Sequence, residues 1–198
     1  MENLIKRAKD IILQPKTTWE EIKNEQTSIQ GILVSYILPL ALIPAIASFI
    51  GFGLIGASVP FVGRMHSIEW GLNQAITSFV SMFLGVLISG WVISWLAPKF
   101  DTNLSFENGV KLVAYSYTPA LVAGVFNVIP ALAIIGLLAG IYSLYVLYLG
   151  FKPVTNVSDD KTTSYFVVSI VVIIAVYIVL GLILGVVLGT AGLTSFKY

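Results

Sequence analysis

The sequence predicts an all-α integral membrane protein: a polytopic helical bundle of five transmembrane helices, preceded by short amphipathic, interfacial helices. Four stretches lack Asp, Glu, Lys and Arg, namely residues 26–63, 70–98, 112–151 and 162–196, and together they hold 142 of the 198 residues. Charged residues make up 11% of the chain, whereas a soluble domain carries about 25%. Since one crossing needs about 20 apolar residues, three stretches hold one span each and 112–151 holds two.

The chain therefore divides into a cytoplasmic amphipathic N-terminal segment, residues 1–28, and a five-helix membrane domain, residues 29–198. Residues 3–13 are typical of an amphipathic helix, because their apolar side chains fall within an arc of about 120°: Leu4, Ile5, Ala8, Ile11 and Ile12. This stripe, with Ile5 and Ile12 as its candidate interaction residues, either packs on the ends of the spans or contacts lipid headgroups.

A second short helix follows Pro15. Thr18 and Glu21 have the spacing of a capping box, in which each side chain satisfies a free backbone N–H at a helix start. Trp19, a further candidate interaction residue, is expected at the membrane boundary. The charged side chains of this helix predict a solvated face.

The distribution of basic residues predicts the orientation. With spans near 30–55, 71–97, 111–127, 130–150 and 165–189, nine Lys and Arg residues fall on one side, and only Arg64 and Lys197 fall on the other. The positive-inside rule then places the N-terminus in the cytoplasm and the C-terminus outside. A turn from Asn127 to Pro130 separates the third and fourth spans, since proline is suited to the first position of a helix.

Small and polar residues predict how the spans meet. Glycines recur every four residues in the fifth span, at Gly181, Gly185 and Gly189, and in the fourth, at Gly136 and Gly140, where we expect another helix to approach closely, within the chain or in a homo-oligomer. A polar seam on the second span is either a helix contact or a ligand path: Gln74, Ser78, Ser81, Gly85 and Ser89. Prolines in spans, at Pro39, Pro44 and Pro119, are expected to bend or break their helices.

The composition argues against catalysis. The chain has no cysteine, and His66, its single histidine, lies in the outer loop between the first two spans. No catalytic residue, cofactor or metal site is expected, because nucleophilic and metal-dependent mechanisms need clustered bases or ligands. The net charge of +1 lacks the dense basic cluster that nucleic-acid binding requires, so we expect no nucleic-acid partner.

The start of the third span reads Ala114-Tyr115-Ser116-Tyr117-Thr118-Pro119. This segment resembles the Gly-Tyr-Ser-x-x-Pro signature of the Yip1 family of five-span membrane proteins, and it makes Tyr115, Ser116, Tyr117 and Pro119 candidate interaction residues. The stretches 11–22, 36–40 and 142–150 are similar to the family's bacterial branch, which implies a bacterial cytoplasmic (inner) membrane protein. Eukaryotic members are associated with small GTPases and membrane traffic through an Asp-Leu-Tyr-Gly-Pro motif, whose nearest counterpart here, residues 30–32, lacks both acid and tyrosine.

The leading functional hypothesis is a non-enzymatic scaffold or membrane-organising protein with a trafficking-like role. Its partners would be membrane lipids and a protein at the cytoplasmic face, met by the N-terminal helices and the Tyr115 region. The alternative is a small passive or partner-driven transporter component for a neutral solute, using the polar seam of the second span. A lipid-active enzyme comes third and would have to draw catalytic groups from connectors, such as Asp101 or Glu107.

Overall fold

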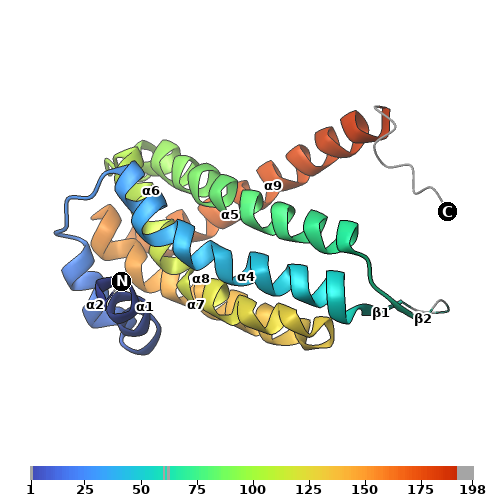
Figure 1. The fold of residues 1–198 in the computed structure, drawn as a ribbon. Helices are drawn as coiled ribbons and strands as arrows, with labels where there is room; N and C mark the ends of the chain where they lie inside the picture. Colours follow the sequence, from blue (N-terminus) through green and yellow to red (C-terminus); the bar gives the residue numbers. More distant parts are fainter. Residues whose placement is uncertain (1, 60, 62, 191–198) are drawn as a thin grey trace.

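A computed structural model describes residues 2–59, 61 and 63–190, and it confirms the predicted all-α helical bundle (Figure 1). Two short helices come first, α1 (Glu2–Leu13) and α2 (Pro15–Ile22). The other elements follow in this order: α3 (Ile29–Ile32), η1 (Leu33–Ile37), α4 (Leu38–Ile50), η2 (Gly51–Ile55), β1 (Ala57–Val59), β2 (Gly63–Met65), α5 (Ile68–Leu96), η3 (Ala97–Phe100), α6 (Phe106–Ser116), α7 (Thr118–Ala123), η4 (Gly124–Val128), η5 (Pro130–Leu132), α8 (Ala133–Thr155) and α9 (Asp159–Thr190).

Four helical segments are long and apolar enough to cross a bilayer: Ile29–Ile55, Ile68–Phe100, Pro130–Thr155 and Asp159–Val179. The pair Phe106–Ser116 and Thr118–Val128 passes the same criterion together but is bent by 40°, so the count is five if this pair forms one broken span. The structure thus has apolar helix at each of the five places where the sequence predicts a span. The chain is an integral membrane protein of the polytopic helical class.

The first span accommodates its prolines without ending. The five residues of η1 form a π-helical turn that ends at Ile37, two residues before Pro39, and α4 continues through Pro44. Because proline lacks an N–H, the helix interior loses a regular hydrogen bond, and a π turn shifts the pairing by one residue. The expected disturbance at Pro39 therefore takes the form of a local change of helical pitch within a continuous span.

The two ends of the bundle differ (Figure 1). One end carries α1, α2 and the connectors from η3 to α6 and from α8 to α9, and the last two are joined by an ion pair between Lys161 and Asp101. Thr102 Oγ1 also donates to the Thr155 carbonyl at 2.5 Å. The opposite end carries a small antiparallel hairpin of β1 and β2, with Ala57 opposite Met65. This hairpin was not predicted from the sequence.

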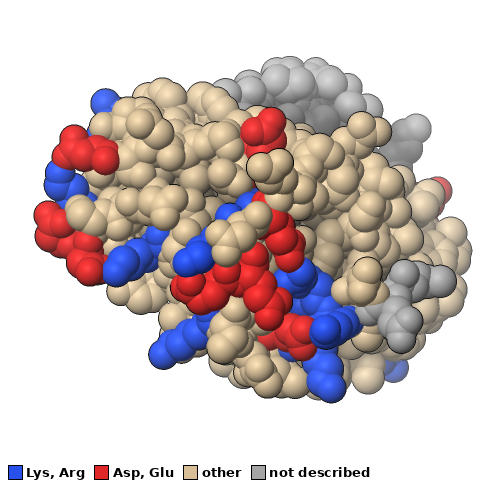
Figure 2. All heavy atoms as spheres, turned by 90° about the vertical axis from the view of Figure 1, so that its left-hand side faces the viewer, with Lys and Arg blue, Asp and Glu red and all other residues tan. Residues whose placement is uncertain are grey.

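Charged side chains gather at the end that carries α1 and α2, as Figure 2 shows for the face turned to the viewer. We call this the charged end. The basic residues of α1, α2 and the two connectors all belong to it, whereas Arg64 lies in β2 at the opposite end. Lys197 falls outside the described residues. The fold thus segregates charge along the bundle axis as the basic-residue count predicts.

Glycines bring helices together at positions other than those predicted. A Cβ placed on Gly109 of α6 would lie 2.4 Å from the Gly90 carbonyl oxygen of α5, and one on Gly124 would lie 2.5 Å from Pro44 Cβ. In contrast, a Cβ on Gly136 or Gly140 would meet no described atom within 4 Å. Among the described residues, no helix approaches α8 closely at these two glycines.

The glycine pattern of the last span is only partly visible. Gly181, Gly185 and Gly189 belong to α9, but their packing lies outside what the structure describes. Over its described length α9 starts beside α5 and α8 at the charged end and extends away from the other helices toward its C-terminal end (Figure 1).

Candidate functional site at the charged end of the bundle

The helices α1 and α2 pack on the bundle as one unit, which we call the N-terminal cap. Trp19 is its principal anchor, with a fully buried side chain whose Nε1–H donates to the Val146 carbonyl at 3.0 Å. Its indole covers Gly150 so closely that a Cβ there would lie 2.3 Å from Trp19 Cε2. Trp19, expected at the membrane boundary, packs its indole inside the protein, because Gly150 in α8 leaves room for the ring.

The start of α2 also differs from the prediction. The helix begins at Pro15, with Gln14 as its N-cap and no side-chain capping bond. Thr18 lies one turn inside and its Oγ1 donates backwards to the Gln14 carbonyl at 2.8 Å. The predicted capping box from Thr18 to Glu21 does not form, because proline is already favourable in the first helical turn and starts the helix earlier.

The apolar stripe of α1 is divided between the bundle and the surface. Ile11 is fully buried, Ile12 is half-buried, and the Ile12 carbonyl accepts a hydrogen bond from Tyr142 OH at 2.7 Å. Within the stripe Ile5 remains 66% exposed, and Leu13, which lies outside the stripe at the end of the helix, is 65% exposed. The helix itself runs across the bundle axis and not along it (Figure 1). Packing against the spans thus occupies one part of the stripe and leaves another part free.

The segment from Tyr115 to Pro119 forms a break between two helices. α6 ends at Ser116, Tyr117 lies between, and α7 begins at Thr118. Pro119 has no N–H to offer the carbonyl of Tyr115 four residues earlier, and the Thr118 hydroxyl donates to that carbonyl instead, at 2.6 Å. Ser116 Oγ likewise bonds within its own helix, to the Leu112 carbonyl at 2.7 Å.

Buried side chains connect the break between α6 and α7 to the first span. Tyr36 OH and Thr118 Oγ1 lie 2.7 Å apart and share a hydrogen bond. The ring of Tyr115 packs against that of Tyr36 with centroids 4.6 Å apart, and against Trp19 edge-on at 6.3 Å. The structure therefore brings Trp19 and Tyr115 together, although they were predicted from separate features. Thr118 is central to the cluster and was not singled out from the sequence.

Charged residues close the cluster on its outer side. The Arg7 guanidinium lies 6.0 Å from the Tyr115 ring centroid and forms ion pairs with Glu21, at 3.5 Å, and with Glu25. Lys111 is buried in α6 and donates to the Glu25 carbonyl at 2.7 Å. The Lys111 hydrogen bond and the Arg7 ion pair both involve Glu25, so they hold the link between α2 and α3 against α6 and Tyr115.

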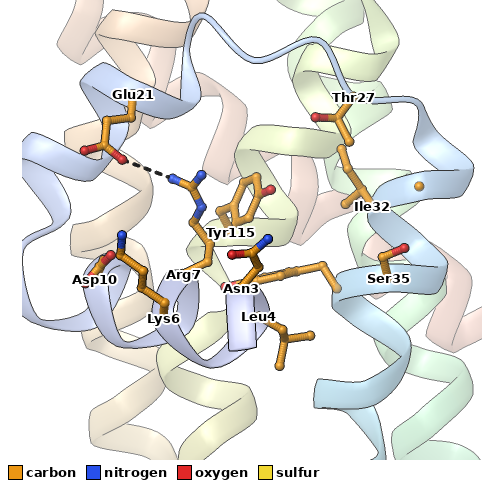
Figure 3. Close-up of a pocket in the computed structure, with 12 residues that line it drawn as sticks. Asn3, Leu4, Lys6, Arg7, Asp10, Glu21, Thr27, Ile32, Ser35 and Tyr115 are labelled. Atoms are coloured by element: carbon orange, nitrogen blue, oxygen red, sulfur yellow. Dashed lines mark hydrogen bonds and ion pairs between the residues drawn. The ribbon is translucent and has the colours of Figure 1, made fainter. Parts of the chain in front are cut away.

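A cavity of about 360 Å³ opens beside this cluster (Figure 3). Lys6, Arg7 and Asp10 reach it from α1, and Ile32 and Ser35 line it from the first span, with Tyr115 between the two sides. Thr27 lines it from the link that precedes α3. Its other lining residues are Asn3, Leu4, Glu21, Gly31 and Tyr36. The Tyr115 side chain is only 7% exposed, and its hydroxyl forms no hydrogen bond with the described residues. We call this hollow the cap cavity.

A second hollow, of about 210 Å³, lies between α5, the α6–α7 break, α8 and α9. Its walls are mostly aliphatic, with hydroxyl groups supplied by Ser89, Ser116, Tyr117 and Ser143. Ser89 Oγ is buried and has no hydrogen-bond partner among the described residues. The predicted seam on α5 is thus split, because Gly85 and Ser89 are buried whereas Ser81 is exposed.

The described residues hold no group of three or more His, Cys, Asp or Glu side chains placed to bind a metal ion. Asp101 is paired with Lys161, and Glu107 lies in the first turn of α6.

The apolar spans, the bent pair α6 and α7, and the charged end define a polytopic helical membrane protein with a structured N-terminal cap. Comparison with known proteins makes this assignment specific. The model of the Yip1 domain matches residues 9–194, so the chain belongs to the Yip1 family, as the resemblance of the Tyr115–Pro119 segment predicts. The chain is 28% identical to the Inner membrane protein YohC of Escherichia coli, in strains K12 and O6:H1, over 156 residues that cover 76% of this chain and 80% of the relative. No solved structure matches the chain.

Proposed function

We propose that this chain is a non-enzymatic, membrane-organising protein of the bacterial inner membrane, which acts through the N-terminal cap in the cytoplasmic leaflet. The Escherichia coli relatives are named as inner membrane proteins, which supports this location. The segregation of basic residues to the charged end supports a cytoplasmic N-terminus.

One observation carries the proposal: α1 is held across the bundle axis with apolar side chains left uncovered. Trp19 and Ile11 anchor the cap in the core, so its position is fixed relative to the spans. Ile5 and Leu13 project from the same helix, which also carries Lys6 and Lys9. Exposed apolar side chains on an interfacial helix insert about 5–10 Å into the headgroup region, and neighbouring lysines attract anionic lipids. A rigidly mounted interfacial helix would occupy area in one leaflet only.

The test is reconstitution into liposomes of bacterial lipid composition, followed by measurement of vesicle diameter by electron cryomicroscopy. We expect the wild-type protein to shift vesicles toward smaller diameters in proportion to protein density. The double variant Ile5→Asn and Leu13→Asn should lose this effect, whereas Ile5→Leu with Leu13→Ile should keep it. Vesicles of equal size with wild type and the double Asn variant would contradict the proposal.

A passive or partner-driven transporter for a neutral solute is the second candidate, favoured by the hollow beside Ser89. A buried hydroxyl without a partner costs free energy, and a passing solute with a hydrogen-bonding group would relieve that cost. Proteoliposomes tested by swelling with glycerol or urea should then show flux that Ser89→Leu reduces. Swelling equal to that of protein-free liposomes would exclude this activity for both solutes.

A further inference from the structure

The cap cavity has the chemistry of a headgroup site. Its volume of about 360 Å³ falls within the usual range for small-molecule pockets. It is bounded by three parts of the chain that are far apart in sequence: α1, the start of the first span and Tyr115. Tyr115 as a whole residue is more than nine-tenths buried, and it forms part of the cavity wall. A hydroxyl on a cavity wall can donate a hydrogen bond to a ligand oxygen.

The charges lining the cavity are balanced. Two cations, Lys6 and Arg7, face two carboxylates, Asp10 and Glu21. Arg7 is already paired with Glu21 and Glu25, while Lys6 and Asp10 form no ion pair with the described residues. A simple anion would gain the attraction of Lys6 but would be opposed by the carboxylates. A ligand that carries one positive and one negative group matches both.

The positive group of that ligand is a primary ammonium. Carboxylates such as Asp10 accept hydrogen bonds, and a primary ammonium donates three. A quaternary ammonium cannot donate and is recognised instead by open aromatic faces. Tyr115 does not offer such a face, because the Arg7 guanidinium lies over its ring at 6.0 Å.

The surroundings favour a lipid over a free metabolite. Leu4 and the buried side chain of Ile32 supply apolar lining, and in Figure 3 Leu4 lies at the lower edge of the cavity, while Glu21 lies at the upper edge, where the chain leads from α2 toward the first span. The hydrophobic end of a lipid would pass this apolar edge as its headgroup met the charges above.

We propose that the cap cavity binds a phospholipid headgroup that carries a phosphate and a primary ammonium, as in phosphatidylethanolamine. The phosphate accepts from Lys6 Nζ and Tyr115 OH, and the ammonium donates to the Asp10 carboxylate. This inference rests on the proposed placement of the charged end at the inner leaflet. It identifies phosphatidylethanolamine as the lipid that the cap cavity binds.

The test is a titration of the detergent-purified full chain with dihexanoyl phosphatidylethanolamine, phosphatidylglycerol and phosphatidylcholine, with bound lipid counted by native mass spectrometry. We expect phosphatidylethanolamine to bind about tenfold more tightly than either other lipid. Tyr115→Phe, which keeps the aromatic packing, and Lys6→Gln should each weaken that binding by about fivefold. Lys9→Gln, on the same helix and outside the cavity, should change it less than about twofold.

Equal binding of the three lipids would overturn the proposal, as would equal losses for Lys6→Gln and Lys9→Gln. Binding of inorganic phosphate or of chainless glycerophosphoethanolamine as tight as that of the lipid would also overturn it, because the ligand would then be a soluble one. The melting temperature of each variant shows that it is folded. Ile5 and Leu13, the residues of the vesicle experiment, do not line this cavity, so the headgroup site and the membrane-organising function can fail independently.

Discussion

Replacing Gly150 by alanine should release the N-terminal cap from the bundle. The added Cβ would lie 2.3 Å from Cε2 and 2.6 Å from Cδ2 and Cζ2 of Trp19, whereas carbon atoms at rest lie about 3.5–4.0 Å apart. The indole must therefore move by about 1 Å or more. Because Trp19 Nε1 is bound to the Val146 carbonyl one turn earlier on the same helix, such a shift also breaks that hydrogen bond.

The expected cost combines two effects. Overpacking a filled site costs about 1–3 kcal/mol, and losing one hydrogen bond costs about 0.5–1.5 kcal/mol. The docking of the cap should weaken by about 1.5–4.5 kcal/mol. Hydrogen–deuterium exchange of residues 3–22 in detergent should then rise steeply, while exchange in α5 stays unchanged.

Gly136→Ala is the matched control on the same helix. A Cβ there meets no described atom within 4 Å, and alanine favours helix over glycine by about 1 kcal/mol, so exchange of the cap should not increase. If Gly150→Ala leaves exchange of residues 3–22 at the wild-type level, the buried seat of Trp19 is wrong and so is the fixed position of α1.

Three further predictions concern the packing around the site, each read from thermal unfolding in detergent. A double-mutant cycle of Tyr36→Phe and Thr118→Val should give a coupling of about 0.5–1.5 kcal/mol from their 2.7 Å hydrogen bond, and additive losses would show that the bond does not form. Gly109→Ala should destabilise the α5–α6 contact by about 3 kcal/mol or more, since its Cβ would lie 2.4 Å from the Gly90 carbonyl oxygen; a wild-type melting temperature would refute this crossing. Thr102→Val should cost about 1 kcal/mol by removing the bond to the last carbonyl of α8, and an unchanged melting temperature would argue against that link between connectors.

The positions of the spans could be predicted because lipid imposes a simple rule on composition. Each charge-free run contains helix, and the turn expected from Asn127 to Pro130 falls at the end of η4 and the start of η5. The membrane leaves little freedom here, since every backbone polar group must be paired within the segment or by a neighbour.

The contacts between helices could not be predicted in the same way. Spacing of four residues identifies one face of a helix but not what lies opposite, so Gly136 and Gly140 look like a packing seam and yet face no described neighbour. Isolated glycines such as Gly90 and Gly150 make the close approaches instead, to partners distant in the sequence. The role of Trp19 depends on Gly150, 131 positions later, and no local pattern contains that information.

At the Tyr115–Pro119 segment the sequence predicts the location of the site but not all of its residues. The resemblance to the Yip1 signature draws attention to Tyr115, Ser116, Tyr117 and Pro119, and the structure places a helix break there. It does not indicate Thr118, whose hydroxyl bonds to both Tyr36 and the Tyr115 carbonyl. Neither does it indicate Arg7 and Lys111, because their pairing with Glu25 depends on how the cap folds back.

The most direct test of the account is the location of the charged end relative to the membrane. The chain has no cysteine, so single cysteines at Lys9, Asn103, Ser158 and Arg64 can be labelled with a membrane-impermeant maleimide in spheroplasts. The account predicts that only the cysteine at Arg64, in the hairpin at the opposite end, reacts before the membrane is opened, and that the other three react afterwards. Labelling of the cysteine at Lys9 or Asn103 in intact spheroplasts would contradict it, because the cap would then not lie at the cytoplasmic surface.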